Sequence, residues 1–129
     1  MNVKPTQSII VTWGSWIAGI GLILLAAQCF VYQGAADGYG VSPVDDKGFA
    51  YLLATGMRDL SLGMTTIFLL LKHRSSLGIY FLLLTVVPIA DTLIVLRYGN
   101  SVFNLAPHVI GIVGLLAIAY LAIQEQKAA

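Results

Sequence analysis

Residues 48–71 read GFAYLLATGMRDLSLGMTTIFLLL, an apolar stretch that holds an arginine and an aspartate side by side, Arg58 and Asp59. A helix needs about 20 predominantly apolar residues to cross the hydrocarbon core of a bilayer. On insertion scales, an Arg and an Asp at the centre of such a helix together cost about 5–7 kcal/mol. The stretch is therefore long enough to span a membrane, but its two charges need partners elsewhere in the chain.

Three further apolar runs accompany this stretch, at residues 8–32, 77–96 and 105–123. Of the 129 residues, 58% are apolar and 10% are charged, which is well below the charged share of about 25% in soluble domains. We therefore predict an all-α, four-transmembrane-helix bundle that forms one integral membrane domain over residues 1–129, with the lipid bilayer as its partner. The net charge of +1 supplies no basic face, so no nucleic-acid partner is expected.

The first apolar run also has features of a secretory signal. It is longer than the apolar region of a signal peptide, which is about 7–15 residues, so a retained span is expected. The end of the bundle predicted to hold both termini carries more cations than the other end, with Lys4, Lys72, Arg74 and Lys127 against Lys47 and Arg97. The positive-inside rule then predicts that both termini are cytoplasmic. The sequence does not indicate which membrane holds the chain.

Small residues recur at helical spacing in the first and last runs. They are Gly14, Ser15, Ala18, Gly19 and Gly21 in the first, and Gly111 and Gly114 in the last. Transmembrane helices approach one another most closely where their side chains are small. We predict that these positions form helix–helix contacts.

Four ionisable residues lie within the apolar runs and are the candidate catalytic residues: Arg58, Asp59, Asp91 and His108. Ionisable residues inside a membrane are costly and mark functional sites by default. Because successive residues of a helix are about 100° apart, Arg58 and Asp59 should diverge. We expect Asp59 to join the small-residue face of its helix and Arg58 to reach Asp91.

Pro88 precedes Asp91 by one helical turn. A proline inside a helix removes a backbone hydrogen bond and kinks the helix. A kink beside a carboxylate predicts space for a small ligand or a water molecule.

The sequence contains no cofactor motif: neither a phosphate-binding loop nor a dinucleotide fingerprint is present. Its single cysteine, Cys29, has no Cys or His at metal-ligand spacing. We therefore expect neither a cofactor nor a metal.

The chain resembles an uncharacterised family of small four-span membrane proteins, classed as a domain of unknown function, with an intramembrane Gly-x-Arg-Asp-Leu-x-x-Gly motif. The matching residues here are Gly56 to Gly63, with Ala90-Asp91 in the third run and Pro107-His108 in the fourth. The resemblance implies the four-helix architecture and marks Arg58, Asp59, Asp91 and His108 as the site. It implies no established activity.

Three functions fit these residues. The first is binding or conversion of a lipophilic small molecule by cofactor-free acid–base chemistry, as in an isomerase, cyclase or hydratase. The second is a proton- or ion-coupled transport element, which at this size would require a homo-oligomer. The third is a structural or assembly subunit in which the charged residues fix the helix register. The sequence alone leaves all three open.

Overall fold

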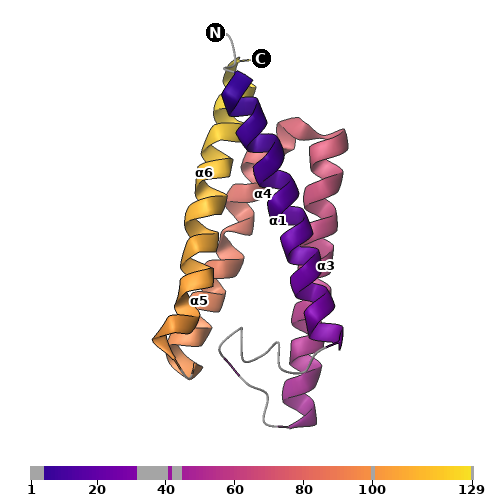
Figure 1. The fold of residues 1–129 in the computed structure, drawn as a ribbon, viewed down its shortest axis with the longest axis vertical. Coiled ribbons are helices and arrows are strands. Elements are labelled where there is room, and N and C mark those ends of the chain that lie inside the picture. The colour runs from indigo at the N-terminus through magenta and orange to yellow at the C-terminus, as the bar shows by residue number, and fades with distance from the viewer. Residues whose placement is uncertain (1–4, 32–40, 42–44, 100, 129) are drawn as a thin grey trace.

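The computed structural model describes residues 5–31, 41, 45–99 and 101–128, which form four helical rods and no strand (Figure 1). The first two rods are α1 (Pro5–Val31) and α3 (Asp46–Lys72). After the short helix η1 (Arg74–Ser76), the third rod consists of α4 (Leu77–Leu84) and α5 (Val86–Tyr98). The short helix η2 (Val102–Leu105) leads into the fourth rod, α6 (Ala106–Ala128). The predicted all-α, four-helix arrangement is confirmed.

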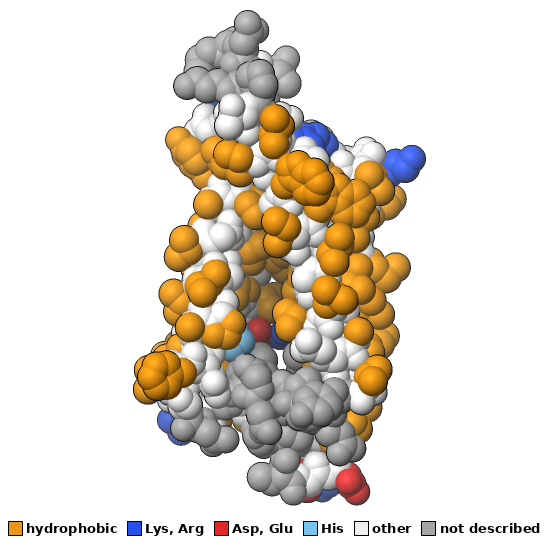
Figure 2. All heavy atoms as spheres, in the orientation of Figure 1, with side chains coloured by type: hydrophobic (Ala, Val, Ile, Leu, Met, Phe, Trp, Pro, Cys, Tyr) orange, Lys and Arg blue, Asp and Glu red, His pale blue; other side chains and the backbone are white. Residues whose placement is uncertain are grey.

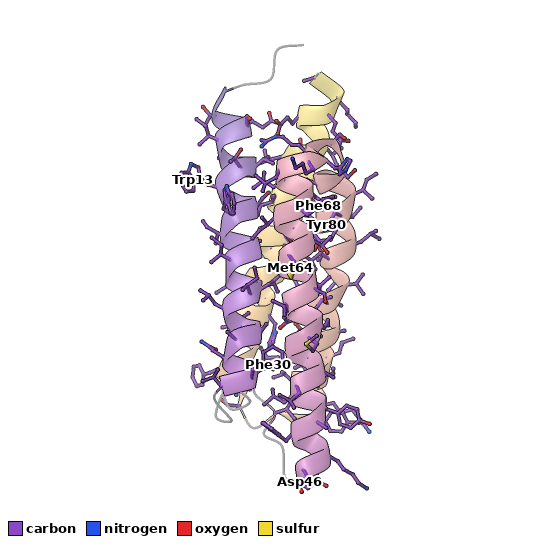
Figure 3. The ribbon with its side chains drawn as sticks, turned by 90° about the vertical axis from the view of Figure 1, so that its right-hand side faces the viewer. Trp13, Phe30, Asp46, Met64, Phe68 and Tyr80 are labelled. Carbon is purple, nitrogen blue, oxygen red and sulfur yellow. The ribbon has the colours of Figure 1, made fainter. Side chains whose placement is uncertain are left out.

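Three of the described segments are long and apolar enough to cross a membrane: Thr6–Val31, Arg74–Tyr98 and Val102–Ala128. The second rod, α3, is not among them, and it carries the charged residues Arg58 and Asp59 near its middle. Large apolar side chains cover the outer surface of the molecule (Figure 2). Trp13, for example, is 65% exposed and points away from the bundle (Figure 3). An apolar exterior of this extent is compatible with lipid rather than water as the surrounding medium.

Both described ends of the chain lie at one end of the bundle, together with the η1 turn (Figure 1). Lys72 and Lys127, in the last turns of α3 and α6, therefore share that end, as the four-span topology predicts. Lys4 lies outside the described residues. The opposite end holds the start of α3 and the short helix η2.

The terminal half of the bundle is tightly closed. Its apolar core consists of Val11, Leu70, Leu77, Phe81, Leu84, Ala119 and Ala122, which come from α1, α3, α4 and α6. Above this core, Arg74 donates hydrogen bonds to Glu125 Oε1 at 2.9 Å and to Thr12 Oγ1 at 2.8 Å. These bonds connect η1 to both α6 and α1. The helices are consequently held together at this end.

Glycines bring α1 and α3 into close contact, as the small-residue pattern predicts. A side-chain carbon at Gly63 would lie 2.7 Å from the carbonyl oxygen of Gly19, and one at Gly56 would lie 2.8 Å from Cys29 Cβ. Asp59 is buried on the same face of α3. The two helices can lie this close only because these positions lack side chains.

Gly63→Ala is expected to destabilise the protein by about 1–3 kcal/mol, because the new methyl group would overlap the backbone of α1. Thermal unfolding in a mild detergent measures the effect. Gly114→Ala is the matched control, since no described atom lies within 4 Å of its new carbon. That change should be neutral or stabilising by up to about 1 kcal/mol, because alanine favours helix more than glycine does. Equal stability of the two variants would contradict the close packing.

The third rod is interrupted at Thr85, between α4 and α5. Pro88 has no N–H to donate to the carbonyl of Leu84, so the regular helical bonding fails at this point. The Thr85 hydroxyl donates to the carbonyl of Phe81 at 2.9 Å, which partly stabilises the break. The irregularity predicted from Pro88 is therefore present, one turn before the proline and adjacent to the segment that carries Asp91.

Candidate functional site

A cavity of about 1030 Å³ extends from the middle of the bundle into the half away from the termini, and all four rods contribute to its lining. Most of its wall is apolar, with residues such as Leu25, Leu52 and Val87. Figure 2 shows the hollow between α6 and α1, with acidic and histidine side chains at its lower end. The helices that close together near the termini thus surround an open space farther along.

Glycines keep this cavity wide. No described atom lies within 4 Å of a side-chain carbon built at Gly21 or Gly114, and at Gly111 the nearest is Pro88 Cβ at 3.7 Å. The prediction of close helix contacts is therefore wrong for Gly21 and Gly114, whereas Gly111 faces Pro88 of α5 at ordinary contact distance. Gly14 does pack as predicted, since a carbon there would lie 2.8 Å from Ile118 Cδ1. The missing side chains at Gly21 and Gly114 leave space instead.

Arg58 joins two carboxylates at the polar end of the cavity. Its Nη1 and Nη2 atoms donate to Asp91 Oδ1 and Oδ2, each at 3.2 Å. This two-pronged pair connects α3 to α5 and confirms the predicted Arg58–Asp91 contact. Such parallel hydrogen bonds are the strongest arrangement between a guanidinium and a carboxylate.

Arg58 also bonds its neighbour: its Nε donates to Asp59 Oδ1 at 2.9 Å. The expectation that the two adjacent side chains diverge is therefore wrong. The 100° separation holds for the Cα–Cβ bonds, but the long arginine side chain bends back across its own helix. One guanidinium consequently serves both acids.

The three groups differ in exposure. The side chains of Asp59 and Asp91 are only 10% and 8% exposed, whereas that of Arg58 is 35% exposed. The two carboxylates are thus much more deeply buried than the guanidinium that pairs with them. Buried charges require such pairing, because removing an ion from water without a partner costs several kcal/mol.

His108 lines the same cavity from the first turn of α6, directly after Pro107. The structure therefore brings all four candidate residues to one cavity, from α3, α5 and α6. Among the described residues, no group of three His, Cys, Asp or Glu side chains is placed to hold a metal ion.

Sequence reasoning missed three further polar residues of the lining: Gln28, Cys29 and Thr55. Gln28 lies seven residues after Gly21, a spacing that places both on one face of α1. That spacing could have identified Gln28 as a residue on the same side of α1 as Gly21. Cys29 lies beside Gly56 and is buried, and nothing in its sequence context distinguishes it from a packing residue.

These features define a small, all-helical protein with apolar helices compatible with membrane spans and with a buried cluster of charged residues. Residues 19–122 match the family described as Domain of unknown function (DUF4267), and the chain belongs to this family. The match includes the positions of all four candidate residues. Searches of curated proteins and of solved structures gave no match.

Proposed function

We propose that this protein is a multi-pass integral membrane protein, with both termini cytoplasmic, that binds a lipophilic small molecule and converts it by cofactor-free acid–base chemistry. The observation that carries the proposal is the cavity of about 1030 Å³ with an apolar wall and one polar end. Cavities that bind drug-sized molecules have this size and this combination of apolar lining with a few convergent polar groups.

The position of the opening supports access from the bilayer. The hollow faces outward between α1 and α6, whose outer surfaces are apolar (Figure 2). In a membrane, that opening would face lipid chains. A lipophilic molecule dissolved in the bilayer would then reach the cavity without crossing water.

The polar end supports proton-transfer chemistry. Isomerisation, cyclisation and hydration each require a proton to be added at one atom and removed at another. In the proposed mechanism, Asp91 or Asp59 acts as the acid or base, Arg58 polarises the substrate, and His108 relays the proton. Unlike titratable groups around one water-poor cavity are the typical arrangement for this work.

A purely structural role would account for part of this geometry, because Arg58 connects α3 to α5 through Asp91. It would not account for the glycines that keep the cavity wide at Gly21 and Gly114. A bundle selected only for stability would fill that space, since cavities are destabilising. The cavity therefore favours a ligand.

The test begins with the compounds released from the purified wild-type protein by organic solvent and identified by mass spectrometry. Fresh wild-type protein should convert at least one of them, whereas Asp91→Asn and His108→Ala should each slow that conversion by about 10²-fold or more. His108→Ala should unfold at nearly the wild-type temperature, and Asp91→Asn should remain folded at the assay temperature, because Arg58 keeps its bond to Asp59. Conversion at the wild-type rate by both variants would contradict the proposed chemistry.

A further inference from the structure

The charges around the cavity restrict the polar end of the molecule that binds there, and this inference rests on the proposed function. Among the described residues, the charged groups of the lining are Arg58, Asp59 and Asp91, with His108 as the remaining basic group. One guanidinium against two carboxylates gives a formal charge of −1 when His108 is neutral. Residues 32–44, which connect α1 to α3, contain no Lys or Arg that would offset it.

An anionic head group is disfavoured by this arrangement. The positive charge of Arg58 is already engaged by Asp59 and Asp91 through bonds of 2.9–3.2 Å, and the two carboxylates exceed it by one negative charge. A carboxylate or sulfonate at the same place would add a further negative charge to a site of low dielectric constant. Even an anion that accepts a hydrogen bond from Arg58 without displacing an aspartate would lie beside two carboxylates that outnumber the one guanidinium, and it would be repelled by them.

A cationic head group is disfavoured by the order in which the groups are exposed. The carboxylates that would attract it are 10% and 8% exposed, whereas the guanidinium is 35% exposed. All three side chains line the cavity, but the guanidinium offers an ammonium group there more exposed surface than either carboxylate does. The positive charges of the ammonium group and of Arg58 would repel each other.

A neutral hydrogen-bond acceptor suits the remaining hydrogen-bonding capacity of Arg58. A guanidinium has more N–H groups than Arg58 uses on the two aspartates, because Nη1 donates one bond, to Asp91 Oδ1, within the described part of the chain. The second N–H of Nη1 has no acceptor among the described residues. A charge-compensated guanidinium with a spare N–H polarises a carbonyl or ether oxygen without binding an anion.

We infer that the bound molecule is an uncharged lipophilic compound whose carbonyl or ether oxygen accepts a hydrogen bond from Arg58. Its apolar part occupies the space beside Gly21, Gly111 and Gly114. This assigns a substrate class to the proposed site: neutral, oxygen-bearing, membrane-soluble molecules rather than fatty acids or lipophilic amines.

Cys29 provides the readout, because it is the only cysteine of the chain and lines the cavity. The full chain in neutral maltoside micelles is treated with N-ethylmaleimide, and intact mass gives the alkylation rate. Three probes with the same decyl chain are compared: dodecan-2-one, decanesulfonate and decyltrimethylammonium. The ketone should slow alkylation of Cys29 by about tenfold, and each charged probe should slow it by less than about twofold.

The control chain carries Cys29→Ala with Ala27→Cys, which moves the thiol to the exposed face of α1. Each of the three probes should change the alkylation rate of this control thiol by less than about twofold. Equal or better protection of Cys29 by a charged probe would overturn the head-group inference while leaving a binding site in place. Protection by none of the three would overturn both the inference and the proposed binding.

Discussion

Arg58→Leu is expected to lower the free energy of unfolding by about 3 kcal/mol, one of the largest effects of any single substitution in this protein. The reason is that Asp59 and Asp91, each nearly buried, would both lose their partner. The link between α3 and α5 would be lost with it. Denaturant unfolding of the purified protein in detergent micelles, followed by tryptophan fluorescence, measures the change.

The triple variant Arg58→Leu/Asp59→Leu/Asp91→Leu separates charge from packing. Replacing a whole buried ion cluster by apolar residues is often neutral or stabilising, so this variant should regain most of the lost stability. It should also lose any conversion of the ligand, because the acid, the base and the polarising group are gone. If Arg58→Leu is as stable as the wild type, the cluster does not hold the helices together.

Filling the cavity should abolish binding without harming the fold. Gly21→Leu with Gly114→Leu places two large side chains where no described atom lies within 4 Å of the first added carbon. The protection of Cys29 by dodecan-2-one should fall from about tenfold to near onefold, while thermal stability stays the same or rises, because buried voids are costly.

The matched control adds the same side chains on the outside of the same two helices. Ala27→Leu with Ala117→Leu changes exposed positions that do not line the cavity. This variant should keep the full protection of Cys29. A cavity-filled variant that still shows wild-type protection would indicate that the probe binds outside the cavity.

The sequence predicts the helices and the main ion pair because both depend on local patterns. Four apolar runs of membrane-spanning length predict four rods, and the structure contains them. Arg58 and Asp91 are rare charges in apolar helices, and the need for compensation in lipid leaves few pairings open. Pro88 predicts an irregular third helix because its missing N–H acts on its own helix.

The glycines show where such reasoning fails. Helical spacing places Gly19 and Gly21 on different faces of α1, but it does not say what lies opposite each face. Gly19 meets α3, whereas Gly21 meets open space. A small side chain permits close approach and also permits a cavity, so only the positions of the other helices distinguish the two. The close contact at Gly78, where an added carbon would lie 2.6 Å from Ile123 Cγ1, was missed for the same reason.

The Arg58–Asp59 bond was missed because the prediction considered helix geometry and not side-chain length. Neighbouring residues diverge at Cβ, yet an arginine reaches far enough to bend back to the next carboxylate while also reaching another helix. The Arg58–Asp59 bond matters for function. Because the guanidinium of Arg58 is shared by two carboxylates, it has no unpaired positive charge for an anion, and this points to an uncharged ligand.

The most direct test of a ligand in the cavity is native mass spectrometry of the protein purified in mild detergent from its own membrane. The wild type and the Ala27→Leu/Ala117→Leu control should each carry the same uncharged, lipophilic small molecule as an added mass. The Gly21→Leu/Gly114→Leu variant, folded and equally pure, should lack it. The same added mass on all three proteins, or on none, would contradict a ligand site in the cavity.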